Sequence, residues 1–308
     1  MAVKTGRSLR LRALPWQARP RGSEKWFDAA VVVEARDEAE ALSYRGRQFE
    51  PVTPFRCRTI RPTRRQASLI RECLDEADRL LRAFRLTPAR ISLDRVHILS
   101  PSDLRRIARN DRHRAVLWRG HLYLNARYIR NPADLLEVMT HELAHAISMS
   151  VIIFNPRVKS RQAFPLVVYG LRVAGLRVGT VNHAYLALNE VTTEIAAGEM
   201  RRALIERRVV TGRDARRLAK CWRRKTSYGP IISTVLHLLA GRRGSVPPVA
   251  RRLVRCMLTG DPSFVELLKR RGVHDELFAL EIEANQLDAF MVRHADVFDK
   301  PKPRRRPA

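Results

Sequence analysis

The chain has 308 residues, of which 45% are hydrophobic, and it carries a formal net charge of +28 at pH 7. This length and composition predict a globular protein with a sizeable core, organised as one large domain with a small accessory unit. The longest apolar runs, IISTVLHLLA and FPLVVYG, are well short of the roughly 18 residues that a membrane-spanning helix requires.

The four cysteines, Cys57, Cys73, Cys221 and Cys256, lie far apart and form no CxxC pair. This spacing argues against a disulfide scaffold and a zinc ribbon, and it suits a reducing compartment. The first 25 residues are basic but contain no apolar core of a secretory signal, although an organelle transit sequence is an alternative. We therefore expect a soluble, cytoplasmic protein.

The large positive charge favours polyanionic partners, which include nucleic acid, an anionic membrane surface and acidic proteins. Arginine heavily outnumbers lysine, and the chain is also rich in alanine. A compositional bias that leaves a solvated basic surface is therefore an equally good interpretation.

Residues 8–61 contain two extended segments, SLRLRALPW and WFDAAVVVEA, then the helical composition ARDEAEALSYRG and the alternating pattern PFRCRTIR. They predict a small ββαβ accessory unit, which together with the basic N-terminal tail occupies residues 1–62. The basic run RPTRR at 61–65, with Pro62 as a strand breaker, is the expected linker.

Apolar residues at three- and four-residue spacing predict a long amphipathic helix over 66–84. RVHIL then predicts a short strand, which a helix at about 102–109 follows. AVLW and HLYLNARYI, on either side of Gly120, predict a hairpin.

Asn131 and Pro132 predict a helix start, because asparagine can accept a backbone N–H at the N-cap and proline needs no donor at the first helical position. This helix runs to about residue 148. PLVVYGLRVAGLRVGT predicts a hairpin or an irregular loop, and a strong second helix covers 183–206.

The C-terminal third predicts five more helices, at roughly 213–224, 229–240, 247–259, 262–271 and 275–293. The sequence thus indicates an α+β main domain over 63–295 with a mostly helical C-terminal part. The basic tail 296–308 is expected to be disordered.

The helix predicted from 132 carries the pattern HELAH, with His141 and His145 one helical turn apart. Both imidazoles can therefore point at one metal ion, while Glu142, rotated by about 100°, can reach a water on that ion. The alternative is a buried helix that contains two hydrogen-bonded histidines.

A catalytic zinc ion usually has three protein ligands, so the pattern requires another one downstream. LNEVTTE on the second helix supplies Glu190 as a third ligand, and Glu194 could accept the outer N–H of His141. Two exposed helical glutamates are the simpler interpretation of this pair. His183 could instead complete a site made only of histidines, which would leave NEVTTE unexplained.

HELAH at 141–145 followed by NEVTTE at 189–194 resembles the gluzincin clan of zinc metallopeptidases, and the compact layout of residues 66–260 is similar to the minimal gluzincins, or minigluzincins. The resemblance implies a zincin-like domain with a small mixed sheet, an active-site helix and zinc as cofactor. It implies that His141, His145 and Glu190 are the ligands, Glu142 the general base and Glu194 the partner of a ligand histidine.

The order of HLYLNARYI and the HExxH helix also resembles zincins in general, in which an edge strand just before that helix aligns extended peptide. The interval from His145 to Glu190 exceeds that of the thermolysin-like members. Residues 149–184 are therefore expected to be an insertion.

Gluzincins commonly stabilise the oxyanion with a tyrosine or histidine of the C-terminal part, and Tyr228 in KTSYGP is the first choice here. His237 and Tyr185 are alternatives, and Tyr228 could equally be an ordinary half-buried tyrosine. The basic cluster 201–225 could bind phosphates or an acidic substrate, with Trp222 as a stacking face, or it could be a solvated helical surface.

Two functions follow. The first is a zinc-dependent metallopeptidase that hydrolyses peptide bonds with Glu142 as general base. The alternative is a nucleic-acid-associated binding or regulatory protein in which the zincin-like domain is structural or inactive, in keeping with the net charge of +28.

Overall fold

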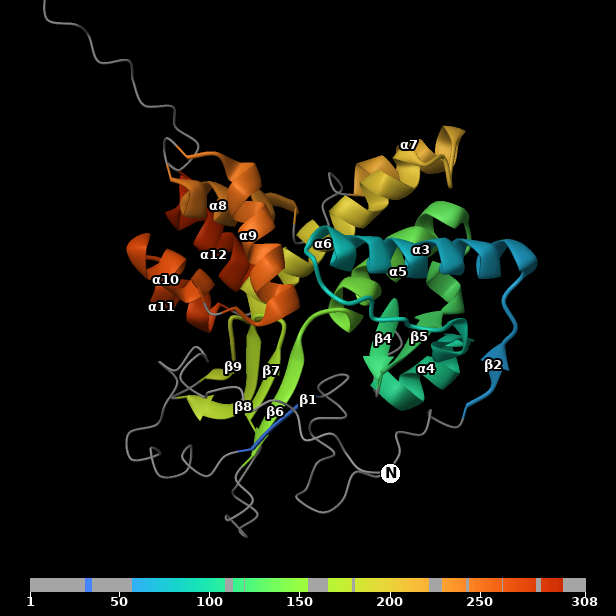
Figure 1. Cartoon of the computed structure of the whole chain (residues 1–308), viewed down its shortest axis with the longest axis horizontal. Coiled ribbons are helices and arrows are strands. Elements are labelled where there is room, and N and C mark those ends of the chain that lie inside the picture. The colour runs from blue at the N-terminus through green and yellow to red at the C-terminus, as the bar shows by residue number, and fades with distance from the viewer. Residues whose placement is uncertain are drawn as a thin grey trace, which may run out of the picture.

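The computed structural model shows a mixed α+β protein that is mostly helical (Figure 1). The described residues are 31–34, 57–108, 113–118, 120–154, 166–178, 181–221, 229–241, 244–261, 263–280 and 284–295. Their strands form two separate sheets, one of four strands and one of five.

The four-stranded sheet has the order β2-β3-β5-β4, with only β3 and β5 parallel. Its strands are β2 (Thr59–Ile60), β3 (Val96–Leu99), β4 (Ala115–Trp118) and β5 (His121–Asn125). The predicted hairpin is confirmed, because β4 and β5 pair antiparallel around Gly120, whose φ of +73° suits a glycine.

The exposed edge of this sheet differs from the prediction. HLYLN was expected to form an edge strand, but β5 lies between β3 and β4, and the edge strands are β2 and β4. The reason is visible in the burial of Leu122, Tyr123 and Leu124, which are fully enclosed, as the residues of a central strand are.

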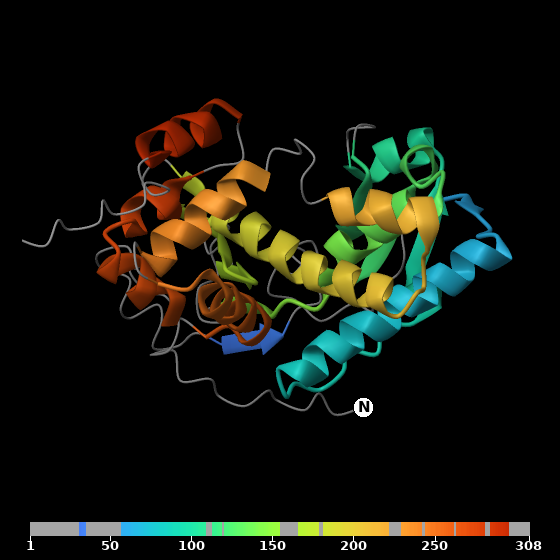
Figure 2. The same cartoon turned by 90° about the horizontal axis from the view of Figure 1, so that it is seen from above.

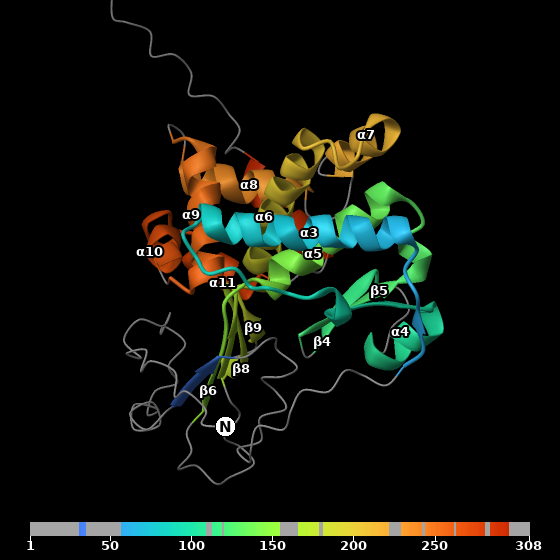
Figure 3. The same ribbon diagram turned by 45° about the vertical axis from the view of Figure 1, so that its right-hand side comes forward.

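Helix α3 (Arg64–Ala83) confirms the predicted amphipathic helix, although it begins within the predicted linker 61–65, and it lies alongside α5 (Pro132–Ala146) (Figure 3). It begins with a capping box, in which Thr63 and Gln66 each accept the other's backbone N–H. The short helix α4 (Pro101–Ala108) packs against the four-stranded sheet. Single 3₁₀ turns, η3 (Leu93–Arg95) and η4 (Ala126–Tyr128), connect these elements.

Helix α5 (Pro132–Ala146) carries HELAH and starts where the sequence predicted. Asn131 is its N-cap, and its side chain accepts the backbone N–H of Asp134 at 3.0 Å. Apolar residues such as Leu136, Met139 and Leu143 bury the helix against its neighbours, so its polar residues are held in fixed directions.

The five-stranded sheet is antiparallel throughout, with the order β1-β6-β7-β8-β9. Its strands are β1 (Val31–Glu34), β6 (Ser150–Phe154), β7 (Leu166–Tyr169), β8 (Arg172–Val178) and β9 (Val181–Ala184). Four of them lie between α5 and α6 (Leu186–Glu206) in the sequence, so the segment 149–184 contains most of this sheet. The β7-β8 pair confirms the hairpin interpretation of PLVVYGLRVAGLRVGT.

The turn between β7 and β8 fixes this sheet to the helices. The Gly170 N–H donates to the Met149 carbonyl at 2.7 Å, and the Leu171 N–H donates to Asn189 Oδ1 at 2.9 Å. Leu171 and Asn189 are both buried. The base of the sheet therefore contacts α6 directly beside Glu190.

The remaining helices form most of the C-terminal half, and α6 runs between them and the part that contains the four-stranded sheet (Figure 2). They are α6 (Leu186–Glu206), α7 (Gly212–Cys221), α8 (Gly229–Ala240), α9 (Val246–Thr259), α10 (Ser263–Arg270), α11 (His274–Ala279) and α12 (Ala284–Arg293).

The single helix predicted over 275–293 is wrong, because the structure has α11 and α12 there. Leu280 is extended, and its carbonyl accepts the N–H of Ala187 at 3.2 Å. The Phe278 carbonyl likewise accepts the Tyr185 N–H at 2.9 Å. These two carbonyls accept backbone N–H groups at the start of α6, where no side chain caps the helix.

The tail 296–308 and most of residues 1–62 lie outside the described residues, including most of the predicted ββαβ unit. The two described strands of that region, β1 and β2, pair with β6 and β3. Within the described ranges, no helix has both the length and the apolar character needed to cross a membrane. All four cysteines are free thiols.

Candidate metal centre

The packing of α5 against α6 brings His141, His145 and Glu190 together. One nitrogen of each imidazole and one carboxylate oxygen all lie within 4.8 Å of one another. Glu190 Oε2 is 3.6 Å from His141 Nε2 and 3.4 Å from His145 Nε2. All three side chains are half-buried, so the cluster is partly shielded from water.

These residues fit a tetrahedral metal ion. Two ligand atoms, each about 2.1 Å from an ion at the tetrahedral angle, are about 3.4 Å apart. The two measured imidazole-to-carboxylate separations, 3.4 and 3.6 Å, are close to that value. Two nitrogen donors and one carboxylate suit zinc and several other divalent first-row metals, so the structure shows a candidate metal site whose metal it does not identify.

Hydrogen bonds at the outer ring nitrogens orient both imidazoles. His141 Nδ1 donates to Glu194 Oε1 at 2.8 Å, as the sequence predicted for this pair. His145 Nδ1 lies 3.3 Å from Thr193 Oγ1. Both Nδ1 atoms are thus occupied, and both Nε2 atoms face Glu190, which is the arrangement that ligand histidines need.

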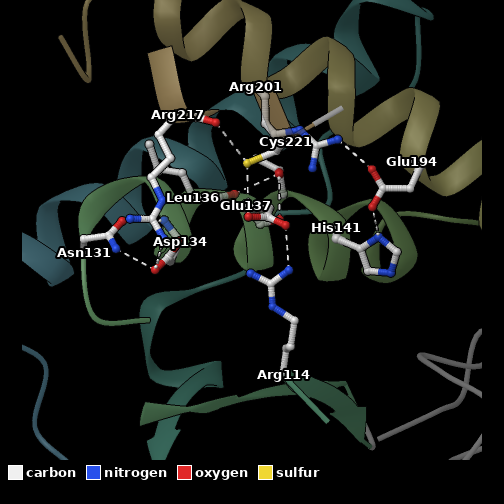
Figure 4. Close-up of polar contacts among 11 residues, drawn as sticks. Arg114, Asn131, Asp134, Leu136, Glu137, His141, Glu194, Arg201, Arg217 and Cys221 are labelled. Atoms are coloured by element: carbon white, nitrogen blue, oxygen red, sulfur yellow. Dashed lines mark hydrogen bonds and ion pairs between the residues drawn. The ribbon is translucent and has the colours of Figure 1, made fainter. Parts of the chain in front are cut away.

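Two of the residues around the ligands were missed in the sequence. Thr193 lies within NEVTTE, and its spacing of three from Glu190 was the signal that could have identified it. Arg201 lies seven residues after Glu194 on the same helix, and its Nη2 donates to Glu194 Oε2 at 2.6 Å (Figure 4). Two helical turns separate them, so a helical-face analysis could have paired them.

The charged groups of this cluster shift one another's pKa values. Burial lowers the pKa of His141, but its hydrogen bond to Glu194 and the carboxylates of Glu194, Glu142 and Glu190 outweigh burial and raise the pKa to about 9. Burial raises the pKa of Glu190, but His145, His141 and Arg172 outweigh it and lower that pKa to about 2. Three carboxylates thus surround the two imidazoles, and the guanidinium groups of Arg201 and Arg172 partly balance their negative charge.

The pKa of Glu194 is also far below the ordinary range for a glutamate. Its burial opposes ionisation, but the His141 hydrogen bond and the guanidinium of Arg201 more than compensate. Glu194 is therefore a carboxylate at neutral pH and can only accept hydrogen bonds.

Glu142 follows His141 directly on α5 and is half-buried. On an α-helix it is rotated by about 100° from His141, so it does not share the direction of the two imidazoles. Its charge nevertheless contributes to the raised pKa of His141, which places its carboxylate near the ligand cluster.

The other predicted site residues lie elsewhere or outside the described ranges. Tyr228 and Trp222 are outside the described residues. His183 is in β9, with its backbone opposite Ala174. The Tyr185 hydroxyl is 2.8 Å from His274 Nε2, and His237 Nδ1 donates to the Ser233 carbonyl at 2.8 Å.

The basic cluster 201–225 divides into two groups where it is described. Some of its arginines are paired: Arg207 binds Glu72 and Glu76, and Arg217 binds Asp134. Five exposed cations form no side-chain ion pair within the described part of the chain, and these are Arg202 on α6 and, on and near α7, Arg208, Arg213, Arg216 and Lys220.

Comparison of the chain with protein-family models, with curated proteins and with solved structures finds no match. The site must therefore be interpreted from its own geometry.

Proposed function

We propose that the protein is a zinc-dependent metallopeptidase of the gluzincin type, with His141, His145 and Glu190 as the zinc ligands. The observation that carries the proposal is the convergence of these three donors at 3.4 and 3.6 Å. The hydrogen bonds that the outer ring nitrogens make to Glu194 and Thr193 support it, because an accidental cluster would not require oriented imidazoles.

In this mechanism a zinc ion would lower the pKa of water and polarise the scissile carbonyl. Glu142, next to the ligands but rotated away from them, accepts the proton of the attacking water and delivers it to the leaving amine nitrogen. Glu194 and Thr193 keep both imidazoles in one orientation throughout. Tyr228 is the proposed hydrogen-bond donor to the tetrahedral oxyanion.

The edge strand β4 supports a peptide as the substrate. Within the described residues it pairs only with β5, and it packs against α5, the helix that carries HELAH. An extended peptide could add to this edge by backbone hydrogen bonding, which places a peptide bond alongside α5. This interpretation transfers the proposed peptide-aligning role from HLYLN to AVLW.

Metal content and peptide hydrolysis, measured on the same samples, test the proposal. Wild type should bind about one zinc ion per chain and hydrolyse a peptide library. Glu142→Gln should retain zinc and lose hydrolysis, because the amide cannot accept the proton. Glu190→Ala should lose zinc as well, because it removes a ligand.

Glu206→Gln is the matched control, since Glu206 is exposed near the end of α6 and should tolerate the same change without effect. Folded wild-type protein that binds no divalent metal would refute the proposal. Hydrolysis that survives Glu142→Gln would refute the assigned base.

The four exposed cations on and near α7 favour a second candidate, association with nucleic acid. Arg213, Arg216 and Lys220 follow each other at three- and four-residue spacing, so they share one face of α7. A cationic stripe of this kind can follow a phosphate backbone. The two proposals are compatible, because the stripe and the ligand cluster use different residues.

A further inference from the structure

A row of hydrogen-bonded side chains connects Arg201, a buried residue of α6, to one of the proposed metal ligands, His141. Arg201 Nη2 is 2.6 Å from Glu194 Oε2, and Glu194 Oε1 is 2.8 Å from His141 Nδ1 (Figure 4). The Arg201 side chain is only 5% exposed, and the side chains of Glu194 and His141 are 19% and 21% exposed.

Glu194 is held at both of its oxygens. One oxygen accepts from His141 and the other accepts from Arg201, so rotation of the carboxylate would break at least one short charge-assisted hydrogen bond. Without Arg201, only the imidazole would fix the carboxylate, and the two side chains could turn together. Arg201 therefore holds the carboxylate of Glu194 in one orientation.

The geometry of α6 explains how the arginine reaches Glu194. Seven residues are close to two full turns, so positions 194 and 201 lie on one face of the helix. Helical side chains lean toward the N-terminus, which directs Arg201 back toward Glu194. Positions 197 and 198 lie between them on this face and are an alanine and a glycine, so no side chain larger than a methyl group lies between the two.

A purely structural arginine is the simpler interpretation. Burying a guanidinium costs several kcal/mol unless a carboxylate compensates it, and any buried carboxylate would serve that purpose. Arg201 is bound instead to the carboxylate that orients His141. Because its partner is Glu194, the buried guanidinium of Arg201 also affects the orientation of His141.

We propose that Arg201 is a positioning residue of the metal centre: it holds Glu194 in the rotamer that keeps His141 Nε2 directed at the metal. This inference rests on the proposed metal site but goes beyond the ligands themselves. It predicts that Arg201 acts on metal affinity only through Glu194.

The first test is zinc affinity, measured by competition with a chromophoric chelator. Arg201→Met should weaken zinc binding about 10- to 100-fold, the usual effect of losing a residue that supports a ligand. Arg201→Lys should give a smaller loss, because an ammonium offers a point charge rather than a planar fork. Arg202→Met is the matched control and should change affinity less than twofold, since Arg202 is the exposed neighbour on the same helix.

A double-mutant cycle with Glu194→Gln separates positioning from general stability. If Arg201 acts through Glu194, the double variant Glu194→Gln/Arg201→Met should bind zinc no more weakly than Glu194→Gln alone. Losses that multiply in the double variant would overturn the proposal. So would an Arg201→Met variant that is folded and binds zinc as wild type does.

Arg201→Met leaves Glu194 with one partner fewer and could unfold the protein, in which case Arg201→Lys decides the question. In the cobalt(II)-loaded protein the visible absorption spectrum reports ligand geometry at the metal. Arg201→Lys should alter this spectrum, whereas a spectrum and affinity identical to wild type would overturn the proposal.

The outcomes separate this inference from the proposed function. Wild-type protein that binds no metal would overturn both. Wild-type protein that binds zinc but cleaves no peptide would refute the proposed activity alone, because the affinity cycle is measured without substrate. Normal zinc binding in folded Arg201→Met would refute the inference alone.

Discussion

Glu137 lies one helical turn before His141 on α5 and makes two polar contacts with other elements (Figure 4). Arg114 donates to its carboxylate at 2.6 Å, and the Cys221 thiol donates at 3.1 Å. Burial raises the pKa of Glu137, but these two partners outweigh it and hold the pKa below its usual range. Glu137 thus connects the residue just before β4 and the last residue of α7 to the helix that carries the ligands.

Glu137→Gln should destabilise the fold at pH 7 by about 2 kcal/mol, because it weakens hydrogen bonds to a charged acceptor. A lowered folded-state pKa gives stability that is present above the unfolded pKa of about 4.3 and is lost as pH falls through the folded value. The difference between wild type and variant should therefore stay constant from pH 7 to about 5 and shrink as pH is lowered below about 4. Urea unfolding at several pH values measures it, and a difference that stays constant at pH values well below 4 would contradict the assignment.

At the residue scale, the sequence was sufficient wherever the chemistry lies within one helix. The spacing of His141, Glu142 and His145 follows from helical periodicity, and NEVTTE offered Glu190 and Glu194 at the same spacing. The spacing of Arg201 from Glu194 and of Thr193 from Glu190 is also readable in the sequence, but spacing alone does not show that these side chains face the ligands, because that depends on how α6 is rotated against α5. The side chains packed between α5 and α6 determine this rotation, and it cannot be read from the spacing of residues along one helix.

At the scale of single elements, the turn at Gly170 offers a sharp comparison with Gly212. Both have a left-handed backbone, with φ of +59° and +57°. A Cβ at Gly170 would lie 2.5 Å from Asn189 Oδ1, whereas a Cβ at Gly212 would meet nothing within 4 Å. The two positions share backbone strain and differ in steric crowding.

Gly212→Ala should cost about 1–2 kcal/mol of unfolding free energy, the strain of a left-handed alanine. Gly170→Ala should cost about 1–3 kcal/mol more, because Asn189 must shift. It should also weaken zinc binding, since Asn189 precedes Glu190, while Gly212→Ala leaves zinc affinity unchanged. Denaturant unfolding and chelator competition measure both effects, and equal losses in the two variants would count against the contact.

The elements themselves were predictable to different degrees. The start of α5 at Asn131 is a local signal that the sequence predicted, whereas the capping box of α3 lies at Thr63, inside the segment predicted as a linker. The pairing of β1 with β6 joins segments more than 100 residues apart, and no local pattern encodes it. The break at Leu280 arises because its carbonyl serves the N-terminus of α6.

At the scale of the whole molecule, metal binding should stabilise the fold, because the ligands come from two helices of the core. A ligand at 100 times its dissociation constant adds about 2.7 kcal/mol. With an unfolding entropy of about 2.1 cal/mol/K per residue, this corresponds to a rise in Tm of about 4 °C. Thermal unfolding with and without a chelator measures the shift, which Glu190→Ala should abolish.

The net charge of +28 predicts that the chain binds DNA in a salt-dependent manner. If α7 forms the binding face, replacing Arg213 and Arg216 by serine should reduce the slope of log affinity against log salt by about 2. The matched control replaces Arg251 and Arg255, which are exposed on α9, and should reduce the slope less. If both variants reduced the slope equally, DNA would be attracted by the overall charge of the protein and not by α7 in particular.

The five-stranded sheet has a topological consequence. Four of its strands lie between His145 and Glu190 in the sequence. The turn at Gly170, midway along this segment, contacts Asn189 beside Glu190. An ion bound by these two residues would close a loop of about 45 residues, much as a disulfide does. In the chain-entropy description such a closure removes about 4 kcal/mol of freedom from the unfolded state. A metal at this site would thus be a reversible cross-link in a protein whose cysteines are all free.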